Sequence, residues 1–226
     1  ARRSLEDIQA QSLSVDAALC EASVSRPAVQ AVIGHCVESN TVLEVADLAV
    51  RPGIDAKCLA LEVGRRLIEV SRLATAAVFL VPTVPAVRQY FSAAEEFGRL
   101  VPYPLVGSSE VDDWGSLEWR SLLCRHNLLI TTPQLFLDAL NARHIRLSMF
   151  CMLLVDECHH CSGRHPYARI FSEHYRRLCP PGKIRVLGLS TCLVRSKAKD
   201  RGERQQAIRR LEKLMDAKVM DIGPIQ

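Results

Sequence analysis

Short, mainly apolar runs alternate with longer amphipathic segments along most of this chain. The short runs have the length of strands that are buried in a sheet. The strands predicted in this way are Asn40–Val45, Ala76–Val81, Leu128–Ile130, Met152–Val155 and Arg185–Leu189. The amphipathic segments have helical spacing, and the helices predicted are Pro27–Glu38, Cys58–Leu73, Val84–Phe97, Leu117–Arg125, Gln134–Leu140 and Tyr167–Leu178.

Buried strands that alternate with helices are typical of a parallel, doubly wound sheet in a three-layered α/β fold. In the segment Cys58–Leu73 the apolar side chains recur at helical spacing, and we expect Glu62 and Arg66 to lie on the outer side of that helix. Ligands of such folds bind at the carboxyl ends of the strands, so the functional residues are expected there.

Composition narrows the class of protein. With 226 residues and a hydrophobic content of 48%, the chain can fill a substantial core, which argues against disorder. The nine cysteines are an odd number, scattered within apolar runs, so we expect reduced thiols and no disulfide. No uncharged apolar run reaches the roughly eighteen residues of a membrane span, and the first residues lack the apolar stretch of a signal peptide. We therefore expect a soluble protein of the cytoplasm or nucleus with no membrane partner.

The charge and the ends of the chain add two weaker expectations. The formal net charge of +4 is mild, although the basic clusters Arg195–Lys199 and Arg201–Arg210 could contact phosphates. The chain lacks an initiator methionine, and its last residues, up to Gln226, show no sign of the end of a domain, so we expect a fragment of a longer protein.

The most specific chemical signal is the run Asp156-Glu157-Cys158-His159, which directly follows four apolar residues. A buried strand that ends in two carboxylates can place one beside a hydrated magnesium ion and the other beside a water that attacks a phosphoryl group. One alternative is an ordinary acidic turn. Another is a zinc site made of residues 158–161, but consecutive residues rarely all reach one tetrahedral ion.

The run Asp156-Glu157-Cys158-His159 matches motif II of the DECH-box superfamily 2 helicases, and its continuation through His165-Pro166-Tyr167 resembles Dicer proteins in particular. Other segments match further helicase motifs in the correct order. They are residues 79–89 for motif Ia, residues 130–135 for the threonine-proline-glutamine motif, residues 186–192 for motif III and residues 211–219 for the exit from the domain. The resemblance covers roughly residues 26–220 and implies a RecA-like, P-loop NTPase fold.

This resemblance assigns roles to residues around the acidic turn. Asp156 would hold magnesium through its water shell, and Glu157, also near the metal, would position the hydrolytic water. His159 would couple the site to motif III through Ser190 and Thr191. Thr191 stands where the family has a small apolar residue, which puts the geometry of that coupling in doubt.

The resemblance also implies binding residues for ATP and RNA. Gln30 lies near the position of the glutamine that reads adenine in related proteins, although Val29 replaces the usual aromatic residue. The expected contacts to double-stranded RNA are backbone contacts that do not read sequence. The residues that would make them are Thr83, Arg88, Gln89, Thr132 and Gln134.

The phosphate-binding loop departs from the family pattern. Residues 46–58 contain one glycine, and Lys57 and Cys58 occupy the positions of the family's lysine and hydroxyl residue. Pro52 lacks an amide donor, and a sulfur is a poor ligand for magnesium. Loss of two or three charge-assisted hydrogen bonds would weaken ATP binding on the order of a hundredfold to many thousandfold. An alternative is that residues 46–56 come from a mispredicted exon boundary.

The sequence therefore predicts an N-terminal extension at residues 1–25, a RecA-like helicase domain at residues 26–220 and the start of a linker at residues 221–226. The expected function is that of the first helicase lobe of a Dicer-like endoribonuclease in RNA silencing, with ATP and magnesium bound weakly or not at all. Its expected partners are double-stranded RNA, the second RecA-like lobe and ribonuclease III domains of the same protein, and a separate RNA-binding protein. The alternatives are a non-catalytic helicase module and an RNA sensor helicase of the innate-immune type.

Overall fold

A parallel sheet lies at the centre of the computed structural model, which describes residues 24–44, 55–71, 76–107, 111, 114–178, 184–193 and 201–220. The strands are β1 (Thr41–Glu44), β2 (Ala76–Leu80), β3 (Pro102–Leu105), β4 (Leu128–Thr131), β5 (Phe150–Val155), β6 (Arg185–Ser190) and β7 (Lys218–Met220). Within the described residues they form one seven-stranded sheet in the order β3-β4-β2-β5-β6-β1-β7, with every neighbouring pair parallel. Strand β5, which precedes the acidic turn, is therefore the middle strand.

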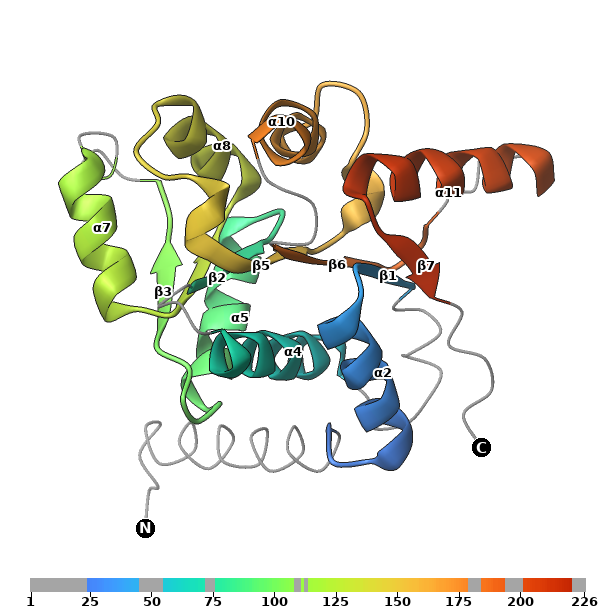
Figure 1. Ribbon diagram of the computed structural model, residues 1–226, viewed down its shortest axis with the longest axis horizontal. Helices are drawn as coiled ribbons and strands as arrows, with labels where there is room; N and C mark the ends of the chain where they lie inside the picture. Colours follow the sequence, from blue (N-terminus) through green and yellow to red (C-terminus); the bar gives the residue numbers. More distant parts are fainter. Residues whose placement is uncertain are drawn as a thin grey trace, which may run out of the picture.

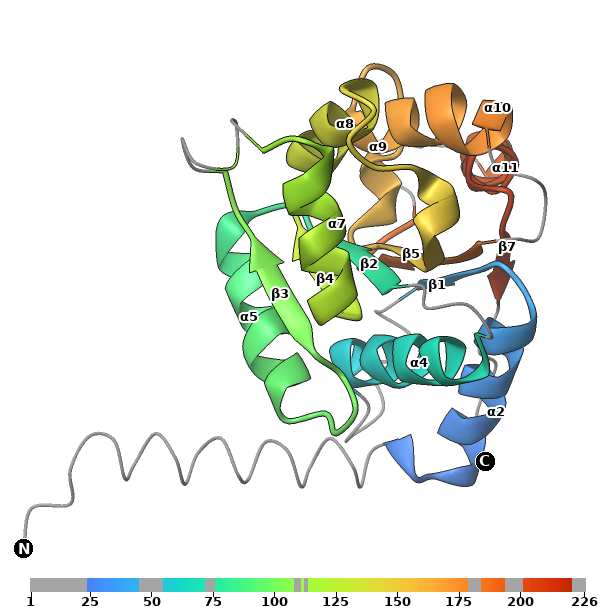
Figure 2. The same cartoon turned by 60° about the vertical axis from the view of Figure 1, so that its left-hand side comes forward.

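Helices cover both faces of the sheet (Figures 1 and 2). The lower layer in Figure 1 consists of α2 (Pro27–Glu38), α4 (Ala56–Val70) and α5 (Val84–Glu95). The other layer consists of α7 (Ser116–Arg125), α8 (Pro133–Asn141), α9 (Pro166–Arg169), the π-helix η3 (Ile170–Tyr175), α10 (Arg176–Leu178) and α11 (Arg201–Met215). Two 3-10 turns, η1 (Leu147–Met149) and η2 (Cys158–His160), flank β5. The three-layered α/β architecture expected from the sequence is confirmed.

The elements predicted from the hydrophobic pattern are all present, with ends that differ by a few residues. The pattern did not predict β3, β7 or α11. It also predicted a regular helix over Tyr167–Leu178, where the structure has a π-helical turn between α9 and α10. A π-helix holds one more residue per turn than an α-helix, and it occurs mostly as single turns, often near functional sites.

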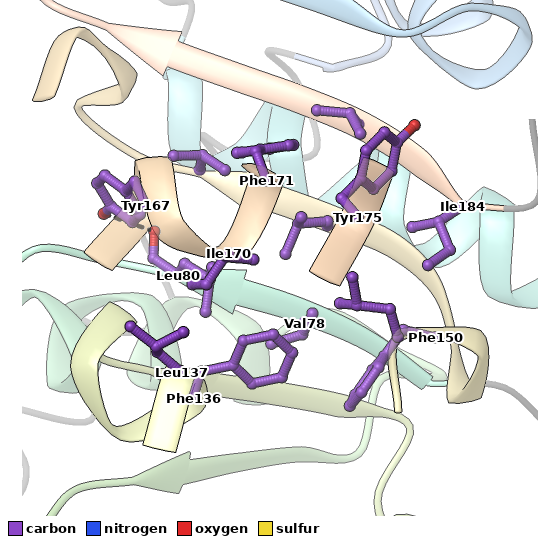
Figure 3. Packing of buried hydrophobic residues seen from close by; sticks show 14 of the residues in the cluster. Val78, Leu80, Phe136, Leu137, Phe150, Tyr167, Ile170, Phe171, Tyr175 and Ile184 are labelled. Atoms are coloured by element: carbon purple, nitrogen blue, oxygen red, sulfur yellow. Dashed lines mark hydrogen bonds between the residues drawn. The ribbon is translucent and has the colours of Figure 1, made fainter. Parts of the chain in front are cut away.

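Two hydrophobic cores result from the alternation of side chains along the strands. In β2, Val78 and Leu80 face the core beneath α8 and α9, whereas Ala77 and Phe79 face the core beneath α4 and α5. Figure 3 shows the first of these cores between the sheet and the helices that follow β4 and the acidic turn. Because both faces are covered, the strands read as continuous apolar runs in the sequence.

Short connections at the carboxyl ends of β2 and β4 begin the next helices in the same way. Thr83 is the N-cap of α5, and its hydroxyl accepts a hydrogen bond from the amide of Ala86 at 3.3 Å. Thr132 is the N-cap of α8, which starts with Pro133. Threonine and proline at these positions favour the start of a helix directly after the strand. The two helix starts are therefore held close to the ends of two neighbouring strands.

One glycine lies where the sheet leaves little space for a side chain, and two prolines lie in an edge strand. A Cβ atom at Gly188 in β6 would lie 2.9 Å from Met215 Cε and 3.1 Å from both Cys158 Sγ and Val42 Cγ2. At the other end of the sheet, the edge strand β3 carries Pro102 and Pro104 and, among the strands that the structure describes, pairs with β4 alone. Proline lacks the amide hydrogen that a ladder requires, which is why it is found at sheet edges.

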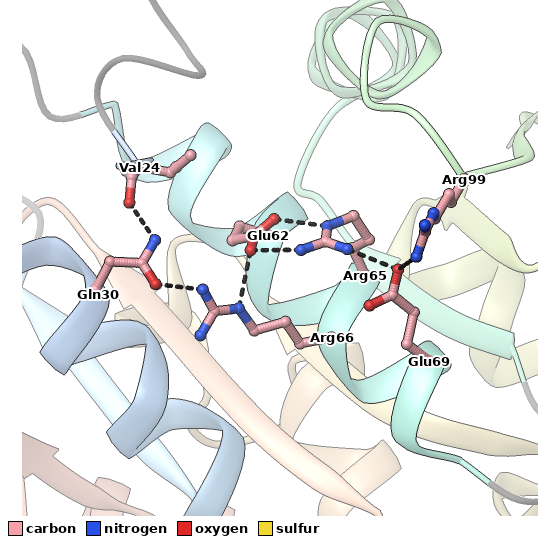
Figure 4. Close-up of polar contacts among 7 residues, drawn as sticks. All are labelled: Val24, Gln30, Glu62, Arg65, Arg66, Glu69 and Arg99. Atoms are coloured by element: carbon pink, nitrogen blue, oxygen red, sulfur yellow. Dashed lines mark hydrogen bonds and ion pairs between the residues drawn. The ribbon is translucent and has the colours of Figure 1, made fainter. Parts of the chain in front are cut away.

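The prediction that Glu62 lies on the outer side of its helix was wrong. Its side chain is buried, and its carboxylate accepts hydrogen bonds from Arg65 at 2.7 Å and from Arg66 at 2.8 Å (Figure 4). Burial acts to raise the pKa of Glu62, but the bonds and charges of the two arginines outweigh it and the pKa lies below its ordinary value. Arg65 also forms an ion pair with Glu69, and Glu69 forms a second ion pair with Arg99.

Candidate functional site

The acidic turn stands at the carboxyl end of the middle strand. The amide of Asp156 donates a hydrogen bond to the carbonyl oxygen of Leu80 at the end of β2, at 3.0 Å. Glu157 follows with φ 49° and ψ 47°, in the left-handed region that a residue other than glycine rarely adopts. Its amide donates to Asp156 Oδ1 at 3.0 Å. The strained turn places the two carboxylates next to each other, at the edge where this class of fold binds ligands.

Asp156 has an unusual electrostatic environment. Burial, and then the charge of Glu157, raise the pKa of Asp156 to about 6. The hydrogen bonds from the Glu157 amide and the Tyr90 hydroxyl, together with the positive charge of Lys57, oppose this rise. Of these opposing effects, the charge of Lys57 is the smallest. Residues 45–54, which contain most of the unusual phosphate loop, lie outside the described residues.

Glu157 and His159 contact the end of β6. His159 Nδ1 lies 2.9 Å from Ser190 Oγ and 3.1 Å from Glu157 Oε2. The hydroxyl of Thr191 donates to the same Glu157 oxygen at 2.9 Å. The structure thus brings together His159 and Ser190, as the resemblance implied, and it joins Thr191 to Glu157.

The residues at the start of α4 include only some of the groups that would bind ATP. Asp55 caps the helix by accepting a hydrogen bond from the amide of Lys57 at 2.8 Å. Cys58 is disulfide-bonded, so the expectation of reduced cysteines throughout was wrong. The carboxylate of Asp156 suits a hydrated magnesium ion. Cys58 supplies neither a hydroxyl nor a free thiol, so the described residues fit ATP with magnesium only in part.

Gln30 is used by the protein itself. Its side-chain amide donates to the carbonyl of Val24, and its carbonyl accepts a hydrogen bond from Arg66 (Figure 4). Gln30 thereby joins α2 to the buried Glu62 group of α4. The amide that would read adenine already has partners on both sides.

The predicted RNA residues gather at the ends of β2 and β4. These strands are parallel neighbours, with Leu80 paired to Thr131. The amide of Val81 donates to the carbonyl of Thr131 at 3.0 Å, so the two strand ends are joined. Thr83, Arg88, Gln89 and Gln134 are exposed, and Thr132 is half-buried. Gln134 donates to Asp138 at 2.8 Å. The five candidate residues therefore belong to two adjoining helix starts.

A zinc site at residues 158–161 is not supported. Within the described ranges, no group of three or more histidine, cysteine or acidic side chains is arranged to hold a metal ion. Cys158 and Cys161 are buried, and burial raises the pKa of both thiols, that of Cys161 to about 12. These sulfurs act as small core side chains.

Two tyrosines of the site were missed by sequence reasoning. Tyr90 reaches Asp156 from α5, and the Tyr167 hydroxyl lies 2.8 Å from the carbonyl of Asp156 and 3.1 Å from that of Leu80. Both are buried, so in the sequence they look like ordinary core positions. The available signal was a hydroxyl on an otherwise apolar helix face, because a buried hydroxyl requires a partner.

Comparison with known proteins shows which family the chain resembles. Residues 57–200 match the DEAD/DEAH box helicase family. The chain is 33% identical over 144 residues to Endoribonuclease Dicer homolog 3 of Arabidopsis thaliana, which is 64% of this chain and 9% of that protein. It is 37% identical over 145 residues to Endoribonuclease Dicer homolog 2 of the same plant, covering 63% of this chain and 10% of that protein.

A fungal relative and a solved structure extend the comparison. Dicer-like protein 2 of Cryphonectria parasitica is 33% identical over 143 residues, with 62% of this chain and 9% of that protein covered. The chain thus spans about a tenth of the length of these curated relatives. The Hef helicase domain of Pyrococcus furiosus superposes with a TM-score of 0.61 at 17% identity, covering 85% of this chain and 37% of that one. This likeness confirms the RecA-like fold. No helix in the described part of the chain is long and apolar enough to span a membrane.

Proposed function

Because this chain belongs to the DEAD/DEAH box helicase family, we propose that it is the first motor lobe of a Dicer-like protein and that it holds the backbone of double-stranded RNA. It binds ATP with magnesium weakly or not at all. In the parent protein it serves small-RNA production, beside a second RecA-like lobe and ribonuclease III domains, with a separate RNA-binding protein as a further partner. Cleavage is left to those other domains.

The observation that carries the proposal is the adjoining pair of helix starts after β2 and β4. They present Arg88 and Gln89 on one side and Gln134 on the other, all exposed. Guanidinium, amide and hydroxyl donors at this spacing suit phosphates and the 2'-hydroxyls of an A-form duplex.

RNA binding is tested with the variant Arg88→Ala. We expect the affinity for a blunt RNA duplex to fall about three- to tenfold, whatever its sequence, with a smaller dependence on salt, because one phosphate contact is lost. Arg125→Ala is the matched control, since Arg125 ends α7 just before β4 begins and so lies near the amino end of that strand, away from its carboxyl end. Equal affinities of the two variants, measured by fluorescence anisotropy, would contradict the proposal.

Weak nucleotide binding is supported by the charges around Lys57. The Asp55 carboxylate lies beside the backbone amide of Lys57, the charge of Lys57 acts on Asp156, and Glu157 already disfavours the charge of Asp156. A triphosphate would bring further negative charge to this group, and Cys58 offers no hydroxyl to its metal. Isothermal titration should therefore give no micromolar, magnesium-dependent ATP binding. A micromolar dissociation constant would refute this part.

The disulfide-bonded Cys58 also favours a second candidate function, that of a non-catalytic module which retains only RNA or protein binding. The variant Glu157→Gln separates the two in a protein that includes the second lobe. If the lobe is catalytic, ATPase activity falls at least about a hundredfold with the loss of the water-positioning carboxylate. Activity that is already at background and does not change with the substitution favours the module.

A further inference from the structure

Two direct contacts connect the acidic turn with the end of β6. The first joins His159 Nδ1 to Ser190 Oγ at 2.9 Å. In the second, the hydroxyl of Thr191 donates to Glu157 Oε2 at 2.9 Å, and the amide of Thr191 points to the same oxygen at 3.4 Å.

The donors around Glu157 converge on one atom. Besides the hydroxyl and amide of Thr191, His159 Nδ1 lies 3.1 Å from Oε2 and donates to it in the tautomer that carries the Nδ1 hydrogen. A hydrogen bond to a charged acceptor is stronger than one between neutral groups. These donors belong to two segments that are far apart in the sequence, so the carboxylate fixes the turn after β5 relative to the end of β6.

The backbone of Glu157 makes this support necessary. A residue with a Cβ atom in the left-handed region is strained, and such a conformation persists only when its surroundings hold it. The Glu157 amide is held by Asp156 Oδ1, and its side chain is held by Thr191 and His159. Thr191 is exposed, so it is not required to fill the core.

We propose that Thr191 is a positioning residue whose hydroxyl holds Glu157 Oε2, so that Glu157, His159 and the end of β6 are assembled as one unit. The inference deepens the proposed function, because it rests there on Glu157 as the water-positioning carboxylate. With Oε2 held by the protein, Oε1 is the oxygen left to face a water or ligand. The arrangement also makes the acidic turn and the end of β6 move together.

A double-mutant cycle tests the contact in the chain without ATP or RNA. Thr191→Val removes the hydroxyl and keeps the shape, and Glu157→Ala removes the carboxylate. We expect the two losses of unfolding free energy to be non-additive, because each variant removes the same contact. Thr191→Ser keeps a hydroxyl and should behave as the wild type. In the control, Thr191→Val and Glu173→Ala should be additive, since Glu173 pairs with Arg169.

Amide hydrogen exchange gives a second measurement that a merely structural role would not change. In Glu157→Ala the amide of Thr191 should exchange at least about threefold faster, because it loses its acceptor, while the amides of Leu187 and Leu189 inside β6 should not change. Additive free energies together with an unchanged Thr191 amide would overturn the proposal. Failure of RNA or ATP binding would leave both measurements unaffected, so the two proposals fail separately.

Discussion

Asp156 has a carboxyl group whose negative charge is disfavoured by folding. Its pKa is about 6 in the folded chain, against an ordinary value of 3.8, chiefly because it is buried and beside Glu157. The folded state therefore binds a proton more tightly than the unfolded state. Between these two pH values the stability falls as the pH rises, and above about pH 6 the full loss is present.

The variant Asp156→Asn should for this reason stabilise the chain at pH 7 to 8 by on the order of 2 kcal/mol. Asparagine keeps an oxygen for the Glu157 amide but carries no charge. The gain should shrink as the pH falls from 6 toward 4 and should disappear only well below the ordinary pKa of 3.8, where the aspartate is protonated in both states. Urea unfolding at several pH values measures it, with the exposed Glu203→Gln as the control. A constant effect of Asp156→Asn across this range would show that its charge is not the cause.

Gly188 is a residue whose replacement should disturb the core. In Gly188→Ala the added Cβ meets Cys158 and Val42 as well as the flexible end of Met215, so we expect a loss of about 1–3 kcal/mol. Gly34 has no heavy atom within 4 Å of such a Cβ and lies inside α2. Gly34→Ala should instead stabilise the chain by up to about 1 kcal/mol. Thermal unfolding of both variants checks the pair, and a harmless Gly188→Ala would contradict the packing described.

At the scale of residues, the sequence alone indicated the two carboxylates of the site but not the side chains that reach them through tertiary packing. Asp156 and Glu157 were recognisable because two carboxylates directly follow a buried strand. Tyr90 comes from a helix distant in sequence and Tyr167 from the helix that follows the turn, and their hydroxyls acquire partners only when those helices pack. Nor could the sequence tell that Gln30 is bound to Arg66, since that contact joins two helices.

At the scale of elements, the polar group around Glu62 connects α2 with α4. Glu62→Gln should destabilise the chain by about 1–3 kcal/mol, because Arg65 and Arg66 lose a charged acceptor that is largely buried. Folding lowers the pKa of Glu62, so this contribution is present above its unfolded pKa and is lost as the pH falls through the lower folded value. Chemical denaturation at neutral and acidic pH tests it against Glu95→Gln on the exposed side of α5. Equal stability of the two variants at neutral pH would contradict the role given to Glu62.

The elements that could be predicted share one property, a hydrophobic pattern set by burial. β2, β4, β5 and β6 are buried on both faces and read as apolar runs. β3 was hidden by its two prolines, and β7 is only 3 residues long. α11 is largely exposed along its first half, so its pattern is weak. The π-helical turn could not be predicted, because its buried Phe171 and Tyr175 stand four residues apart, as they would in an α-helix.

At the scale of the whole molecule, the two cores share the same strands. Alternate residues of β2, β4, β5 and β6 serve opposite faces, so neither core can be lost without the other. We expect the fluorescence of Trp114 and Trp119, at one edge of the sheet, and the far-ultraviolet circular dichroism of the whole chain to change together on heating. An earlier fluorescence transition would mean that the edge around α7 unfolds on its own.

The two prolines of β3 have a consequence for how this lobe meets other chains. Val101 turns its carbonyl toward β4, where it accepts from the amides of Asn127 and Leu128. Because successive residues of a strand direct their backbone groups to opposite sides, the backbone groups of Pro102 and Pro104 face away from β4, toward the free edge of the sheet. That rim offers no amide hydrogens at these positions, so a strand from a neighbouring molecule finds no continuous ladder to join. The sheet is in this way protected from growing into aggregates at this end.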